Sequence, residues 1–202
     1  MPVIGNSANN VDSLLGYMMK SEALETFEHA LQDSTDLLKH FDELNTKPPP
    51  PDIEVLKRAS LVMALAALET YFEDRILEAV KGTCSNNKSD NRLTNFYRES
   101  LETDLKYFHS PNTERVRQLY KKYFGVDVSE GWAWNNCDPG KAKAELNRLV
   151  KKRGDIAHRS LRPTTKDAQP KQHAVTRDAL RKHIYFITQI ANATDDFLTS
   201  KI

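Results

Sequence analysis

Along most of the chain, apolar positions recur at three- and four-residue steps between charged ones, which is the period of amphipathic helices. The first such segment runs from Asp12 to Leu44 and predicts one long helix, or two helices separated by a break. The sequence TKPPPPD, residues 46–52, ends it because successive prolines cannot continue a helix. We interpret this proline stretch as a rigid linker, with a proline-rich ligand motif as the alternative.

The next segment predicts a central, buried helix. It starts after Asp52, a residue type that favours helix N-caps, and it is apolar almost all round between Ala59 and Phe72. Charged residues flank this stretch too closely for it to cross a bilayer. Gly82 and the polar residues after it are typical of a helix end. We therefore expect a central helix over residues 52–82.

Four more helical segments follow, joined by polar turns. They cover residues 92–108, 113–124, 141–159 and 176–200. Residues 126–140 contain two tryptophans and several turn-forming residues, which predicts an ordered loop, whereas residues 160–172 form a polar, proline-marked connection. The pattern has no internal repeat, and only 7 glycines occur in the chain. It predicts an all-α helical bundle.

The net charge of +1 conceals a strong asymmetry along the chain. Residues 141–182 hold 13 Lys and Arg against 4 Asp and Glu, whereas the rest of the chain holds 16 against 24. A local positive excess suits a polyanion, because each cation that neutralises a phosphate releases condensed counterions. The alternative is a solvated helix face without a ligand.

Cysteine usage and the N-terminal sequence bear on the compartment. Cys84 and Cys137 lie in unrelated contexts, so we expect reduced thiols instead of a disulfide or a zinc site. The N-terminal residues lack a basic start followed by an apolar run, and no segment has the length of a membrane span. We expect a cytoplasmic protein with no membrane partner.

The residues with the clearest chemistry lie in LVKKRGDIAHR, residues 149–159, where His158 follows Arg153 by five positions. This motif ends a helix, and it follows both the alanine-rich helix that contains ALETYFEDRI and the SPN…LYKKYFG segment. Taken together, these elements resemble the HEPN superfamily, and within it the prokaryotic RiboL-PSP-HEPN branch. The resemblance covers roughly residues 52–197 and depends on the order of the elements more than on any one motif.

The resemblance implies a HEPN helical domain in residues 52–202, preceded by an N-terminal helical extension and proline linker in residues 1–51. Together they would form one compact domain with a long, buried central helix. It also implies a homodimer that cleaves RNA without metal, as in toxin and antiviral defence systems. An antitoxin or a defence-system protein is the further partner expected on this basis. We expect no cofactor and no metal ion.

Both side chains of the motif suit this chemistry. Histidine titrates near neutral pH, so His158 is the expected base that takes the proton from the ribose 2′-hydroxyl. The planar guanidinium of Arg153 would stabilise the negative charge on the pentacoordinate phosphorus. The products would be a 2′,3′-cyclic phosphate and a 5′-hydroxyl, and DNA would resist cleavage. A capping role for His158 and a plain surface charge for Arg153 are the alternatives.

The spacing of the motif sets a geometric condition. Five positions on an ideal helix correspond to a rotation of about 140°, so the two side chains do not share a face. We expect Gly154 to weaken the helix and to let it bend at this point. The resemblance implies that two copies face one another across a twofold axis, which brings two arginines and two histidines to one phosphate. Many relatives have Asn where this chain has Gly154.

Other residues are assigned supporting roles. Asp155 is expected to replace part of the hydrogen bonding of that missing Asn, and Glu69 to orient a catalytic side chain, with ordinary salt bridging as the alternative. Lys151, Lys152 and Arg159 are expected to bind RNA. These five residues complete the predicted site.

Two further hypotheses concern base stacking by aromatic residues and a metal-binding pair. Trp132, Trp134 and Tyr123 could stack on bases, but in a helical protein such side chains usually close the core. Asp155 and His158 have the spacing of a metal-binding pair, yet the sequence has no second pair of this kind. We therefore expect core tryptophans and no metal site.

Three functions are compatible with the sequence. The preferred hypothesis is an endoribonuclease that acts as a toxin or as an antiviral defence effector. The alternative is a non-catalytic HEPN dimer that binds RNA or a partner protein as a scaffold or regulator. A helical adaptor without a nucleic-acid role would show no salt-dependent affinity for RNA.

Overall fold

The fold is built from helices in the part of the chain that the structure describes. This computed structural model describes residues 20–48, 50, 52–86, 91–159 and 174–202. These residues form α1 (Glu22–Leu44), α2 (Glu54–Asn86), α3 (Asn91–Leu105), α4 (Thr113–Phe124), the 3-10 helix η1 (Val128–Glu130), α5 (Pro139–Arg159) and α6 (Arg177–Thr199). No β-strand occurs among them. The predicted all-α helical bundle is confirmed.

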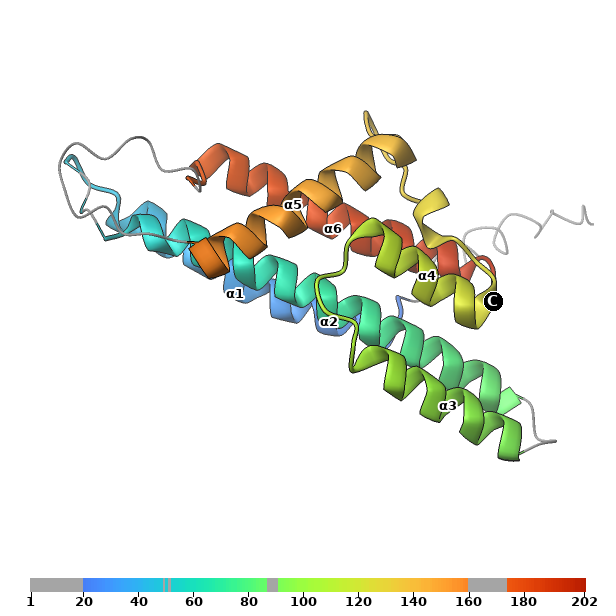
Figure 1. The fold of residues 1–202 in the computed structure, drawn as a ribbon. Helices are drawn as coiled ribbons and strands as arrows, with labels where there is room; N and C mark the ends of the chain where they lie inside the picture. Colours follow the sequence, from blue (N-terminus) through green and yellow to red (C-terminus); the bar gives the residue numbers. More distant parts are fainter. Residues whose placement is uncertain (1–19, 49, 51, 87–90, 160–173) are drawn as a thin grey trace, which may run out of the picture.

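The long helix α2 lies at the centre of the bundle (Figure 1), where α1, α5 and α6 pack against it. Its side chains at Leu61, Ala64, Leu65, Leu68, Phe72 and Ile76 are almost completely buried. The prediction of a buried central helix is therefore confirmed. Its first residue is Glu54, and Asp52 lies in the turn before the helix, so Asp52 does not directly precede it as a cap would.

Helices α1 and α2 approach closely enough for two serines to hydrogen-bond to each other's backbone. The Ser34 hydroxyl donates to the carbonyl oxygen of Ser60 at 2.9 Å, and the Ser60 hydroxyl donates to that of Ser34 at 2.8 Å. Both residues are fully buried, so these bonds satisfy hydroxyls that water cannot reach. The two helices share one hydrophobic core. The domain boundary expected at residue 51 stays a prediction, and residues 1–19 lie outside the described part.

A buried ionic network joins the start of α1, the middle of α2 and the end of α6. Arg75 Nε lies 2.6 Å from Asp195 Oδ1, and Arg75 Nη2 donates to the Thr199 hydroxyl at 2.9 Å. Asp195 also accepts from the hydroxyl and the backbone N–H of Ser21, at 2.5 and 3.2 Å. Burying two charges is favourable only when such additional hydrogen bonds satisfy them. The network therefore fixes how the three helices meet.

The loop between α4 and α5 closes the core near the end of α6. Trp132 is fully buried, and its indole N–H donates to the hydroxyl of Thr194 at 2.8 Å. Trp134 is half-buried and packs against α6. Gly131 leaves room for Phe197, since a Cβ at Gly131 would lie 2.4 Å from Phe197 Cγ. The prediction of a core position is confirmed for Trp132, whereas Trp134 and Tyr123 pack against the core and are half-buried.

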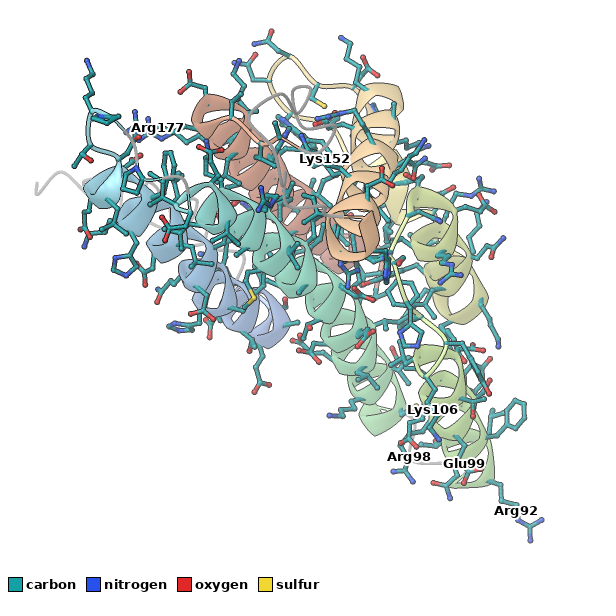
Figure 2. The ribbon with its side chains drawn as sticks, turned by 60° about the vertical axis from the view of Figure 1, so that its left-hand side comes forward. Arg92, Arg98, Glu99, Lys106, Lys152 and Arg177 are labelled. Carbon is teal, nitrogen blue, oxygen red and sulfur yellow. The ribbon has the colours of Figure 1, made fainter. Side chains whose placement is uncertain are left out.

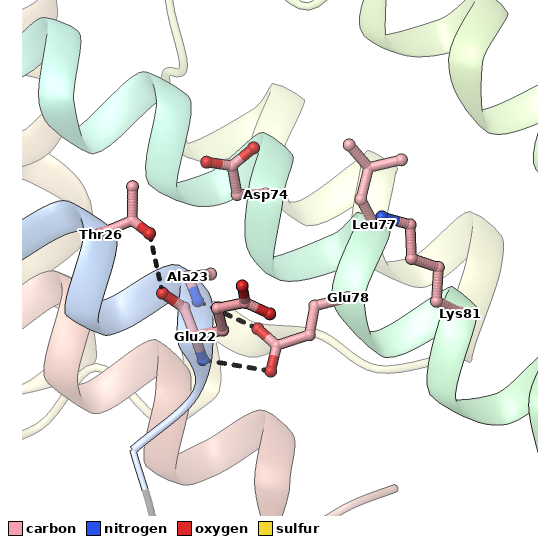
Figure 3. A pocket seen from close by; sticks show the side chains of 7 residues that line it. All are labelled: Glu22, Ala23, Thr26, Asp74, Leu77, Glu78 and Lys81. Atoms are coloured by element: carbon pink, nitrogen blue, oxygen red, sulfur yellow. Dashed lines mark hydrogen bonds between the residues drawn. The ribbon is translucent and has the colours of Figure 1, made fainter.

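A hollow beside the first turn of α1 is explained by capping (Figure 3). Glu78 of α2 accepts the backbone N–H groups of Glu22 and Ala23, at 3.2 and 3.1 Å. A carboxylate at this place satisfies amides that have no partner within the helix and complements the helix dipole. Burial raises the pKa of the neighbouring Asp74. We assign this hollow a structural role.

Helix α3 and the C-terminal end of α2 project from the rest of the bundle (Figures 1 and 2). The hydroxyl of Tyr123 on α4 donates to Asp104 of α3 at 2.7 Å. Figure 2 shows Arg98 near the far end of this arm, well away from Lys152 on α5. The arm is therefore remote from the predicted motif. None of the described helices combines the length and apolar character needed to cross a membrane.

Candidate functional site

The predicted motif lies in the last turns of α5. The helix continues through Gly154 to Arg159 without interruption, so the local bend that we expected is not seen as a break in the helix. A Cβ added at Gly154 would meet nothing within 4 Å, so the surface there is open. Arg153 and His158 therefore keep the rotation of about 140° that a regular helix imposes on them. They lie on different faces of α5.

Arg153 points toward α2, where it pairs with Glu69. Arg153 Nη1 lies 2.6 Å from Glu69 Oε2, and the two side chains are 27% and 14% exposed. A charge-assisted hydrogen bond in this partly buried setting holds the guanidinium more firmly than an exposed ion pair does. The structure thus brings together two residues of the predicted site. The catalytic role of this pair stays a prediction.

The other oxygen of Glu69 holds the connection between α3 and α4. Glu69 Oε1 accepts the backbone N–H of Ser110 at 3.0 Å. Ser110 has a φ of 60°, in the left-handed region that residues with a side chain rarely adopt. Asn112 follows as the N-cap of α4 and accepts from the backbone N–H of Arg115 at 3.0 Å. One carboxylate therefore links α2, α5 and the connection between α3 and α4.

His158 occupies the last turn of α5, and its side chain is exposed. It forms no hydrogen bond or ion pair with another described residue, and none joins it to Arg153. The imidazole is therefore open to solvent and to a ligand. One copy of the chain presents the two motif side chains near the same helix end without bringing them into contact.

The remaining predicted residues differ in their surroundings. Asp155 is half-buried, and Lys151 is exposed. Lys152 donates to the carbonyl oxygen of Ala174 at 3.2 Å, and burial lowers the pKa of its ammonium group. The side chain of Arg159 lies outside the described part of the chain. Lys152 thus ties α5 to the segment before α6, whereas Lys151 faces solvent.

A second carboxylate, that of Glu73, lies beside Glu69 on α2. Glu73 lies one turn beyond Glu69, and burial raises its pKa, an effect that Glu69 enhances and His109 opposes. His109 therefore lies close enough to this carboxylate to interact with its charge. Within the described residues, no three histidine, cysteine, aspartate or glutamate side chains form a cluster that could hold a metal ion.

Several cations of the basic segment are already paired. Arg148 binds Glu145 through two hydrogen bonds of 2.7 and 2.6 Å. Arg177 and Arg181 pair with Asp42 of α1 at 2.5 and 3.2 Å. The hydrogen bond from Arg177 lowers the pKa of the Asp42 carboxyl. Less of this positive charge remains for a polyanion than the composition indicates.

Of three comparisons with known proteins, one finds a match. The model of the RiboL-PSP-HEPN family matches residues 29–200 and thus begins within α1, earlier than the resemblance read from the sequence. A search of curated proteins and a search of solved structures find no match. The family match spans most of the chain and includes every residue of the predicted site. The chain therefore belongs to the RiboL-PSP-HEPN family of the HEPN superfamily.

Proposed function

We propose that the protein is a metal-independent endoribonuclease whose active site is completed by a second copy of the chain. The observation that carries this proposal is the arrangement at the end of α5. Glu69 holds Arg153 at a defined position, while the exposed His158 lies on another face of the same helix. An anchored cation and an accessible imidazole are the groups that cleavage of RNA without metal requires.

In the proposed reaction, His158 takes the proton of a ribose 2′-hydroxyl, and the O2′ atom attacks the adjacent phosphorus. The bond between phosphorus and O5′ breaks, and the leaving oxygen takes a proton from His158 of the partner subunit. Arg153 stabilises the additional negative charge on the phosphate oxygens. Glu69 acts as a positioning residue, because it holds the guanidinium and does not touch the phosphate.

The surface of α2 supports the proposed dimer. Val55, Val62 and Ala66 occupy positions that share a helical face with Glu69. All three are apolar, and none of them is fully buried in the single chain. A second copy that covers this strip would lie next to Arg153, where the composite site requires it. We propose that this face of α2 is part of the dimer contact.

The test is cleavage of a labelled RNA in EDTA by the wild type and by Arg153→Ala and His158→Ala. We expect both substitutions to abolish cleavage, while Arg98→Ala and His40→Ala, exposed residues on other helices, leave it unchanged. The products should carry a 2′,3′-cyclic phosphate, and a DNA of the same sequence should stay intact. Cleavage that survives both motif substitutions, or that requires a divalent ion, would refute the proposal.

One observation favours a second candidate, a non-catalytic dimer that binds RNA or a partner protein. The carboxylate of Glu69 neutralises the charge of Arg153, and an arginine used for structure would have the same contact. Affinity for RNA without any cleavage would support this candidate. For an active enzyme, we propose a toxin or antiviral defence effector, with an antitoxin-like or defence-system protein as its regulator.

A further inference from the structure

A second hollow lies between the first turn of α4 and the middle of α5, close to the proposed active site. It has a volume of about 400 Å³ and is lined by Asn112, Glu114, Asn147, Val150 and Lys151. Asn112 lies two positions after Ser110, and Glu69 holds both Ser110 and Arg153. The same carboxylate that positions Arg153 therefore also fixes one wall of the hollow.

The hollow and His158 lie along one face of α5. Asn147, Lys151, Gly154 and His158 follow one another at steps of four, three and four residues, the spacing that aligns side chains on a helix. Gly154 has no side chain, and its Cβ position is open, so nothing at this position separates the hollow from the imidazole. Lys151 and His158 are about 10 Å apart along the helix axis. A short single strand spans such a distance.

The polar groups of the hollow leave hydrogen-bond donors available to a ligand. Asn147 Oδ1 accepts the backbone N–H of Thr113 at 2.9 Å, and Asn112 Oδ1 accepts that of Arg115. Each amide therefore has its oxygen occupied, while its NH₂ group can donate to another molecule. Lys151 is exposed and makes no ion pair within the described part of the chain.

The lining combines groups that suit one nucleotide. The amide NH₂ groups donate to ring nitrogens or carbonyl oxygens. The carboxylate of Glu114 accepts from Gln118 at 2.8 Å and pairs with Arg117 at 3.1 Å, and its further lone pairs can accept from amino or imino groups. Val150 offers a half-buried apolar surface, and Lys151 offers a cation for a phosphate. Sequence-specific recognition of RNA acts mainly on unpaired bases that are read by such edge contacts.

We infer that this hollow binds a nucleobase of single-stranded RNA close to the scissile phosphate, while Lys151 binds a phosphate of the same strand. The inference rests on the proposed function and adds a subsite to it. It assigns Asn147 and Lys151 to substrate binding and predicts that the hollow contributes to the choice of cleavage position.

The test uses the full chain carrying His158→Ala, which is not expected to cut the probe. Binding of a fluorescein-labelled oligouridylate is measured by anisotropy over a range of salt concentrations. Asn147→Asp keeps the oxygen that Thr113 requires but loses the NH₂ donors, and Asn136→Asp adds the same charge at an exposed loop position. Lys151→Gln is matched by Lys141→Gln, more than two turns away on the same helix.

We expect Asn147→Asp to weaken binding about five-fold more than Asn136→Asp, the loss of roughly one hydrogen bond. Lys151→Gln should reduce the slope of log affinity against log salt by about 0.7, while Lys141→Gln leaves it unchanged. If RNA binds but the two site variants behave like their controls, the subsite is refuted and the proposed nuclease stands. If neither this protein nor the wild type binds or cuts RNA, the proposed function itself fails.

Discussion

His183 gives the bundle a pH dependence that can be worked out from its surroundings. The side chain is almost completely buried on α6, and its Nδ1 atom lies 3.6 Å from Glu145 Oε1 on α5. Burial lowers the pKa of His183 from 6.5 to about 4, because the charged form is disfavoured there. The cations Arg148 and Lys152 contribute to this lowering of the pKa, and Glu145 opposes it.

The sign and size of the effect follow from proton binding in the two states. Below about pH 6.5 the unfolded chain protonates this imidazole, whereas the folded chain does so only below about pH 4. The unfolded state therefore binds more protons in this window, so stability falls as the pH falls through it. The pKa of His183 is 6.5 in the unfolded chain and about 4 in the folded chain. This difference corresponds to about 3 kcal/mol of free energy of unfolding. Above this window His183 contributes no pH dependence.

The measurement is urea unfolding followed by circular dichroism between pH 7.5 and pH 4. Other carboxyl groups also titrate in this range, so the wild type is compared with His183→Gln, whose side chain stays neutral throughout. We expect the wild type to lose about 3 kcal/mol more stability than this variant on acidification. His40→Gln, at an exposed position on α1, should follow the wild type. Equal acid sensitivity in the wild type and His183→Gln would refute the reasoning.

Three further predictions test single features of the fold and the site. Gly154→Ala should raise the free energy of unfolding by about 0.5–1 kcal/mol, because the added methyl group meets open space within a helix. A lower melting temperature of this variant in a thermal melt would contradict a regular helix at this position. Gly131→Ala should lower it by about 1–3 kcal/mol, because its Cβ would collide with Phe197, and an unchanged melting temperature would contradict this packing. Mixing the wild type with an excess of inactive His158→Ala protein should lower cleavage per wild-type subunit, because mixed dimers contain one histidine where the proposed reaction uses two. Undiminished cleavage in mixtures shown to exchange subunits would count against a shared site.

Local signals predicted most of the helices and several of their ends. Thr176 caps α6 by accepting the backbone N–H of Ala179 at 3.2 Å, and Gly125 ends α4 with a φ of 67°, both at the predicted positions. Such caps depend on residues within one turn, so the sequence alone specifies them. The ion pair of Arg75 with Asp195 joins residues 120 positions apart. No local pattern indicates it, because it depends on how α2 and α6 pack.

The difference between local signals and helix packing also applies at the site. The helical period alone implies that Arg153 and His158 lie on different faces, and α5 keeps that period through Gly154. The pairing of Arg153 with Glu69, 84 positions away, depends instead on how α5 packs against α2. The helical period also aligns Asn147 and Lys151 with His158. These residues line a hollow only because the first turn of α4 packs beside this face of α5. Thr113 holds α4 against α5 through Asn147 and the carbonyl oxygen of Lys143, and the contact of Ser110 with Glu69 fixes the preceding turn, so the carboxylate that positions the motif arginine also contributes to the proposed subsite. Glu69→Gln would therefore alter both catalysis and RNA binding, whereas Lys151→Gln would alter binding with a smaller effect on the chemical step.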